Sequence, residues 1–253
     1  MDYVILNIEH KIATVTINRP PVNALNGDLY REIAETMDQI DASDEVSVAI
    51  LRSEGRGFSA GNDVSDIHTT TRANHHAYQK VIAKCMSSVM ECRVPVIAAV
   101  QGYALGAGCC LAASCDMLIA SDDAYFGLPE VTLSIVGGAG FLSMIMPEKM
   151  VNYVAYSGKN VTAQTLHNYG SILSVVTRDR LMYEVNALAS VISKHSQKGL
   201  SSFKKAMSIN RNQRMVEQFY IETLHTDGML ETPAKDECTA AFFEKRSPNF
   251  DNL

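Results

Sequence analysis

Short apolar runs that alternate with glycine loops and helical segments constrain this chain more than any other feature of its sequence. The run "VSVAILRS" leads into the loop "EGRGFSAGNDV", and the run "VPVIAAV" leads into a second glycine loop. A helical segment, "GCCLAASC", and another apolar run, "DMLIAS", come next. Short apolar runs bounded by turn residues are typical of buried strands. The order strand, loop, helix, strand predicts an α/β protein with a largely parallel sheet.

The two ends of the chain carry different patterns. Near the start, "VILNI" has apolar residues at alternate positions, and "KIATVTINRP" follows after a polar break, which predicts a β-hairpin. Past about Arg178 the strand patterns fade, and several segments have the apolar spacing of helices. We predict an α/β core over residues 1–190 and a helical C-terminal region over residues 191–253, with no flexible linker between them.

Charge and hydropathy argue against several classes of partner. A net charge of −6 argues against a nucleic-acid-binding protein, which usually has a basic balance. No stretch approaches the ~18 uninterrupted apolar residues of a spanning helix, so we expect no membrane contact. The segment "MDYVILNIEH" has no basic stretch followed by an apolar run, and the final "DNL" differs from a peroxisomal signal. We therefore expect a cytoplasmic protein.

The six cysteines indicate neither a metal site nor a disulfide framework. They lack paired CxxC spacing, so zinc is not expected, and they are typical of reduced, buried side chains. The glycine loops fit neither the GxGxxG pattern nor the P-loop pattern of nucleotide-binding proteins. We therefore expect no metal and no cofactor.

Two glycine loops are candidates for chemistry. The segment "FSAGND" and the segment "GYALGAGCCLAA" each lie between a predicted strand and a predicted helix. Small residues let the backbone approach a ligand closely, and two such loops can aim one N–H group each at a single oxygen. Taken alone, each loop also fits an ordinary tight turn.

Six segments in order share the pattern of one family. They are "VTINRPPVNALN", "GFSAGNDV", "PVIAAVQGYALGAGCCLAASCDMLIAS", "AYFGLPEVTLSIV", "YSGKNVTAQTLHNYGSILSVV" and "FFEKRSPNF". By these segments the chain resembles the enoyl-CoA hydratase/isomerase superfamily, also called the crotonase family, nearly from end to end. The resemblance implies a crotonase-like α/β spiral of repeated ββα units with a helical C-terminal trimerisation region. It also implies an assembly as a homotrimer or a dimer of trimers.

The resemblance further implies an acyl-CoA thioester as substrate, whose enolate oxygen is stabilised by two backbone N–H groups. Carried onto this sequence, the two donors are the N–H groups of Asn62 and Ala107. The residues expected to contact substrate are Ala60, Gly61, Asn62, Asp63, Val64, Ala107 and Cys110.

Charged residues near these loops have a second interpretation each. Asp63 follows a glycine, where a side-chain oxygen commonly accepts hydrogen bonds from nearby backbone N–H groups. Candidates for contacting the CoA phosphates, each also compatible with an ordinary surface cation, are Arg19, Arg56, Lys245 and Arg246.

Two positions decide which reaction the resemblance predicts. Family hydratases place two glutamates around a water molecule; here Glu130 occupies one of these positions and Cys110 the other. A helix N-terminus lowers the pKa of a thiol and burial raises it, and no histidine or lysine adjacent in sequence offers Cys110 a base. We therefore interpret Cys110 as a pocket-lining side chain that does not react, and its neighbour Cys109 as a packing residue.

A single carboxylate suits double-bond migration, because one group can remove a proton and return it. We predict an enoyl-CoA isomerase in which Glu130 does both. Two alternatives stay open: a hydratase or hydro-lyase that uses Glu130 alone, and a noncatalytic homologue that binds acyl-CoA or a protein. The remaining polar residues are interpreted structurally: His75 and His76 as a solvated helix face, and Asp116 as a cap or solvated turn residue.

Overall fold

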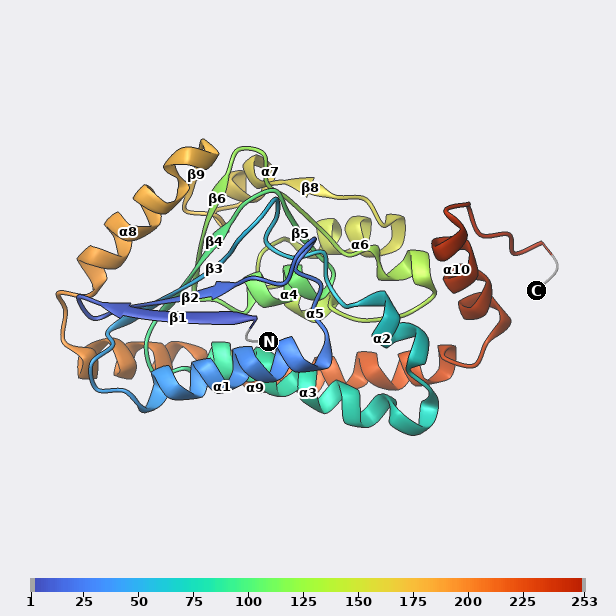
Figure 1. Ribbon diagram of the computed structural model, residues 1–253, viewed down its shortest axis with the longest axis horizontal. Helices are drawn as coiled ribbons and strands as arrows, with labels where there is room; N and C mark the ends of the chain where they lie inside the picture. Colours follow the sequence, from blue (N-terminus) through green and yellow to red (C-terminus); the bar gives the residue numbers. More distant parts are fainter. Residues whose placement is uncertain (1–2, 252–253) are drawn as a thin grey trace.

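A six-stranded sheet forms the centre of the computed structural model, which describes residues 3–251 with the side chain of residue 209 excepted (Figure 1). β1 and β2 are antiparallel, and every later neighbouring pair is parallel. The largely parallel sheet predicted from the sequence is confirmed. In spatial order the strands are β1 (Val4–Glu9), β2 (Ile12–Ile17), β3 (Val48–Ser53), β4 (Val96–Val100), β6 (Met117–Ser121) and β9 (Ser174–Val176).

The predicted hairpin joins β1 to β2 through a two-residue turn. His10 and Lys11 both have positive φ, 51° and 65°. Turns with two positive φ values match the right-handed twist of paired strands.

A second, three-stranded sheet was not predicted. It consists of β5 (Tyr103–Leu105), β7 (Tyr125–Gly127) and β8 (Val161–Thr162). β5 ends just before Gly106, and Ala104 within it forms a bridge with Ser59 of the other glycine loop. This small sheet therefore brings the two glycine loops together.

The faces of the large sheet pack against different helices. Side chains alternate across a strand, so neighbours on β3 belong to different cores. Val48 and Ile50 pack with residues of α8 (Leu181–Ile192), whereas Ala49 and Leu51 belong to the main core with α1 (Gly27–Ala42) and α3 (Arg72–Glu91). In Figure 1, α8 lies on the opposite side of the sheet from α1 and α3.

The C-terminal part is helical, as predicted, and its main element is one 33-residue helix, α9 (Gln197–Met229). α9 runs beside α3 (Figure 1). The predicted division at residue 190 stays a prediction; α8 crosses that position, and Phe219 of α9 packs on the main core. The other helices are α2 (Val64–Thr69), α4 (Ala107–Ala113), η1 (Pro129–Leu133), α5 (Ala139–Leu142), α6 (Glu148–Ser157), α7 (Ala163–Asn168), η2 (Arg178–Arg180) and α10 (Pro233–Glu244).

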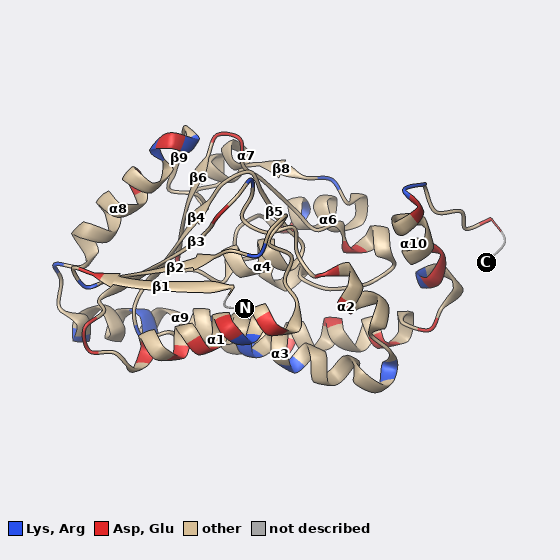
Figure 2. Cartoon of the chain, in the orientation of Figure 1, with Lys and Arg blue, Asp and Glu red and all other residues tan. Residues whose placement is uncertain are grey.

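Acidic and basic residues are mixed along the outer helices, as on α1, α3 and α10 (Figure 2). In the part of the chain that the structure describes, no helix combines the length and hydrophobicity needed to cross a membrane.

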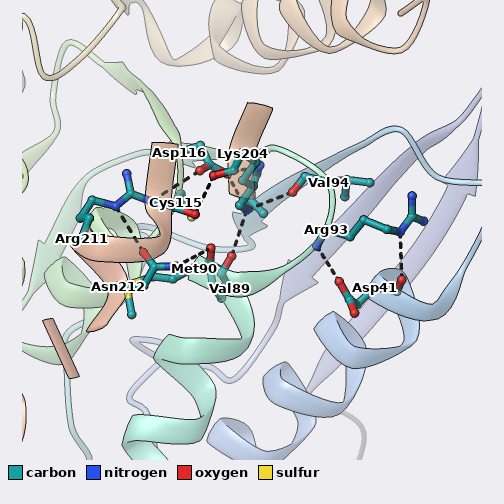
Figure 3. A network of polar contacts seen from close by, with 12 residues as sticks. Asp41, Val89, Met90, Arg93, Val94, Cys115, Asp116, Lys204, Arg211 and Asn212 are labelled. Carbon is teal, nitrogen blue, oxygen red and sulfur yellow. Dashed lines mark hydrogen bonds and ion pairs between the residues drawn. The ribbon is translucent and has the colours of Figure 1, made fainter. Parts of the chain in front are cut away.

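A buried ion pair attaches α9 to the core (Figure 3). Lys204 Nζ lies 2.7 Å from Asp116 Oδ2, and the two side chains are 6% and 18% exposed. The same ammonium donates to the carbonyls of Val89 and Val94 at 3.3 and 3.0 Å. The interpretation of Asp116 as a cap or solvated turn residue is wrong, because α9 covers it. A charge buried in this way is stabilised only while its partner is present.

We predict that Lys204→Met lowers the free energy of unfolding by about 3 kcal/mol, because it leaves the Asp116 carboxylate without its nearest cation. Urea unfolding measures the change. The exposed neighbour Lys205 supplies the control, and Lys205→Met is expected to shift stability by less than about 0.5 kcal/mol. Equal losses in the two variants would contradict the anchoring role.

Candidate active site

A cavity of about 70 Å³ lies where the glycine loops meet α3, η1 and α9. Four of the predicted site residues line it: Asn62, Ala107, Cys110 and Glu130. The other four predicted site residues do not line this cavity. They belong to the "SAGND" segment and its continuation: Ala60, Gly61, Asp63 and Val64.

The two glycine loops touch each other through their backbones. Ser59 N donates to Tyr103 O at 3.1 Å, and Leu105 N donates to Ser59 O at 3.0 Å. A Cβ atom on Gly61 would lie 2.7 Å from Leu105 O and 3.4 Å from the N atom of Ala107. Gly61 also has φ of +91°, which disfavours any side chain. Only glycine therefore lets the first loop approach Ala107 this closely.

The N–H groups of Asn62 and Ala107 are free to bind a ligand. On either side of Asn62, Gly61 O accepts from Leu25 N, and Asp63 N donates to Leu25 O. Asn62 N and Ala107 N themselves donate no hydrogen bond within residues 3–251. Ala107 is the first residue of α4, where an N–H group has no partner inside the helix. Two unused donors therefore belong to loops in contact.

The side chain of Asn62 is held in place by two tyrosines. Tyr30 Oη donates to Asn62 Oδ1 at 2.6 Å, and Tyr78 Oη approaches the same oxygen at 3.4 Å. The two rings meet edge to face, with centroids 6.4 Å apart. These contacts fix the orientation of the Asn62 side chain.

Glu130 belongs to η1, and its carboxyl group lies against the turn before α4. A Cβ atom on Gly106 would lie 2.5 Å from Glu130 Oε1. Glu130 Oε2 is buried and has no hydrogen-bond partner among the described residues. Burial, together with the nearby charge of Glu222, raises the pKa of Glu130 to about 8. A carboxyl group with this pKa can both accept and donate a proton near neutral pH.

Glu222 is a second carboxylate in the cavity, and no motif of the sequence predicted it. It lies on α9 and is 5% exposed. Its oxygens accept from Gly138 N at 2.7 Å and Gly140 N at 2.9 Å, and from Gln218 Nε2 at 3.1 Å. The Glu222 carboxylate is therefore engaged in hydrogen bonds that hold the loop after Glu130.

Cys110 is buried in the cavity wall. Its Sγ lies 3.9 Å from the carbonyl oxygen of Gly138, and the side chain is 4% exposed. Burial raises the pKa of the Cys110 thiol well above its ordinary value, and burial raises that of Cys109 to about 12. Both thiols are therefore protonated at neutral pH, in agreement with the interpretation of Cys110 as a pocket-lining side chain that does not react and of Cys109 as a packing residue.

Asp63 has the loop-stabilising position that its sequence context suggested. It caps α2 by accepting from Ser65 N at 3.0 Å, and it pairs with Arg19 at 2.8 Å. Partial burial acts to raise the pKa of Asp63, but the Ser65 N–H group and the Arg19 guanidinium outweigh it and lower the pKa. Of the predicted phosphate contacts, Arg19 is engaged with Asp63, and Arg246 is engaged with Glu237.

His75 differs from its prediction. It is 2% exposed, whereas its neighbour His76 is exposed as predicted. The Nδ1 atom of His75 pairs with Asp227 of α9, and its Nε2 atom lies 2.8 Å from Gln79 Nε2. The prediction of a solvated face is wrong for His75 because α9 packs against this face of α3.

Within the described residues, no three histidine, cysteine, aspartate or glutamate side chains are arranged to hold a metal ion.

The raised pKa of Glu130 predicts a pH-dependent cost in stability. The folded state holds this proton up to about pH 8, whereas an unfolded glutamate loses it near its ordinary pKa of 4.5, so wild-type stability falls as pH rises between these values. Glu130→Gln buries no charge, so its gain in melting temperature over wild type is expected to be larger at pH 8.5 than at pH 5. Thermal unfolding at both pH values checks this. Glu148→Gln, at an exposed glutamate, is the control; a pH-independent difference for Glu130→Gln would contradict the burial.

Comparison with known proteins places these features in context. The sequence model of the family described as "Enoyl-CoA hydratase/isomerase" matches residues 7–252. The chain is 34% identical over 239 residues to the "(7aS)-7a-methyl-1,5-dioxo-2,3,5,6,7,7a-hexahydro-1H-indene-carboxyl-CoA hydrolase" of Mycobacterium tuberculosis, covering 94% of this chain and 96% of that protein. It is 32% identical over 251 residues to the short-chain-enoyl-CoA hydratase of Clostridium acetobutylicum, covering 97% and 96%. An enoyl-CoA hydratase/isomerase structure from Pseudoalteromonas atlantica superposes with a TM-score of 0.88 at 25% identity, covering 98% and 99%.

Proposed function

Because the chain belongs to the enoyl-CoA hydratase/isomerase family, we propose that it is an acyl-CoA enzyme that moves a double bond, with Glu130 as its only acid–base group. The observation that carries this proposal is the position of the Glu130 carboxyl group. It borders the cavity beside Gly106, carries one unpaired oxygen and has a pKa raised by burial to about 8.

The proposed reaction begins with a 3-enoyl-CoA. The Glu130 carboxylate takes a proton from C2, and the electron pair of the C–H bond moves onto the thioester oxygen to form a dienolate. The N–H groups of Asn62 and Ala107 donate to that oxygen, which lowers the energy of the charged intermediate. The carboxylic acid then returns the proton to C4, and the electrons close a C2–C3 double bond. Nothing is added or lost, and no water takes part.

The two other acidic candidates in the cavity support one-base chemistry. By the family resemblance Cys110 stands where family hydratases have the glutamate that is missing here, and its buried thiol holds its proton. Glu222 already accepts hydrogen bonds from Gly138 and Gly140. Activation of a water molecule by paired carboxylates needs a second free carboxylate, and the described residues that line the cavity supply none.

Hydration of a 2-enoyl-CoA is the second candidate. It is favoured by relatives named as hydratases, including the one from Clostridium acetobutylicum. In this case Glu130 alone would orient the water molecule. A noncatalytic acyl-CoA-binding role is the remaining alternative, and the unpaired Glu130 oxygen beside two free N–H groups argues against it.

We predict that the protein converts a 3-enoyl-CoA into its 2-enoyl isomer and forms no 3-hydroxyacyl product from a 2-enoyl-CoA. Because the carboxylate is the active form, kcat/KM is expected to rise with pH and level off above about 8. Glu130→Gln is expected to lose at least about 10³-fold, and the control Cys109→Ala to keep activity. Mass spectrometry separates migration from water addition. A 3-hydroxyacyl product would assign the hydratase, and binding of both thioesters without reaction would assign the noncatalytic role.

The outer face of α9 supports the proposal of a homotrimer or a larger assembly of trimers. Phe203, Met207 and Leu224 are 72%, 77% and 70% exposed. Phe203 and Met207 form one pair at helical spacing and Ile221 and Leu224 form a second, and the two pairs lie along one face of α9 with about four turns between them. Large apolar side chains exposed together mark surfaces that a partner covers.

We predict that Met207→Asp shifts the protein to smaller species in sedimentation velocity at micromolar concentration. Ser202→Asp, an exposed position off this face, is the control and is expected to leave the assembly unchanged. A wild-type protein that sediments as a monomer at all concentrations would contradict the assembly.

A further inference from the structure

A buried polar chain crosses the cavity wall between α3 and α9. His75 is 2% exposed, and its Nδ1 atom is paired with Asp227 Oδ1. Its Nε2 atom lies 2.8 Å from Gln79 Nε2. His75 and Gln79 both line the cavity that contains Glu130. Buried polar groups are costly unless each one is hydrogen-bonded, so every polar atom of these three side chains needs a hydrogen-bond partner.

One atom has none. Gln79 Oε1 is buried and accepts no hydrogen bond from residues 3–251. Turning the amide over places Oε1 against the imidazole and leaves the NH₂ group unpaired instead. In both orientations the Gln79 amide therefore keeps one unused hydrogen-bonding atom at the cavity wall. A ligand that supplies the missing partner removes the cost of leaving this atom unpaired.

The apolar side chains of this wall discriminate poorly between acyl groups of similar size. Ile82 and Met86 follow Gln79 along α3 and line the same cavity, as does Phe219 of α9. Apolar contacts of this kind accept any hydrocarbon chain that fits. The reaction itself is assigned to Glu130 and two backbone N–H groups, so it leaves Gln79 without a role.

We propose that Gln79, positioned by His75 and Asp227, selects acyl groups that carry an oxygen substituent beyond the carbons between which the proton moves. A hydroxyl group donates to the amide oxygen, and an oxo group accepts from the amide nitrogen. The shared chemistry is a neutral oxygen that replaces the missing partner. This inference deepens the proposed function and rests on it for the thioester that enters the cavity.

The test is calorimetric binding of saturated acyl-CoA thioesters, which have no double bond to move. Three ligands of equal chain length are compared: one with a plain alkyl chain, one with a terminal hydroxyl group and one with an oxo group on the penultimate carbon. Wild type is expected to bind one of the oxygenated ligands about tenfold more tightly than the alkyl ligand. Tight binding of the oxo ligand reports that the amide nitrogen faces the cavity, because an oxo group only accepts, whereas a hydroxyl group pairs with either orientation of the amide.

Gln79→Leu keeps most of the side-chain volume and removes the amide, so the preference is expected to fall to within about twofold. Gln164→Leu, at an exposed glutamine outside the cavity, is the matched control and is expected to keep the preference. The proposal is overturned if the alkyl ligand binds wild type as tightly as both oxygenated ligands, or if Gln79→Leu keeps the preference.

Asp227→Asn tests the positioning role and serves as a second variant should Gln79→Leu fail to fold, which circular dichroism detects. It is expected to weaken the preference by loosening His75, and an unchanged preference would overturn that role. The outcome is separable from the proposed function. A preference for oxygenated ligands without isomerase activity upholds the selection and rejects the reaction, whereas isomerase activity without the preference does the reverse.

Discussion

Close packing at three glycines is the constraint on which the rest of the structure depends. A Cβ atom would lie 2.7 Å from the backbone oxygen of Leu105 at Gly61 and 2.7 Å from that of Ser59 at Gly108, and real Cβ atoms do not approach backbone this closely. At Gly106 a Cβ atom would lie 2.5 Å from the side-chain oxygen Oε1 of Glu130, and Gly61 and Gly106 also have positive φ. The glycines therefore allow two loops and η1 to meet, which places two unused N–H groups and one carboxyl group around one cavity.

The C-terminal helix completes that cavity from a distant part of the chain. Lys204 and Asp116 attach α9 near its beginning, whereas Glu222 and Thr226 hold the loop after Glu130 near its end. The charge of Glu222 also contributes to the raised pKa of Glu130, after burial. Docking of α9 is therefore coupled to the protonation of the proposed acid–base group. A helix far from the glycine loops in sequence is therefore part of the site.

Sequence patterns predicted the family and the strands whose residues show a local apolar pattern. The family resemblance is confirmed over residues 7–252, and the runs read as strands became β3, β4 and β6. The strands of the second sheet are only two or three residues long and depend on non-local pairing, so the periodicity of the sequence did not predict them. His75 is the clearest error. Its neighbours are polar and its partner Asp227 lies 152 residues later, so the local sequence pattern could not predict burial by α9.

The central claim is that one carboxyl group carries a proton from C2 to C4 of the acyl chain. The most direct test uses a 3-enoyl-CoA labelled with deuterium at C2, converted in ordinary water under single-turnover conditions, with the product analysed by mass spectrometry and NMR. Transfer by Glu130 predicts measurable deuterium at C4 of the 2-enoyl product, because the buried carboxyl group exchanges its proton with solvent more slowly than it returns it. Product with only solvent hydrogen at C4 at every pH would contradict a single shuttling group.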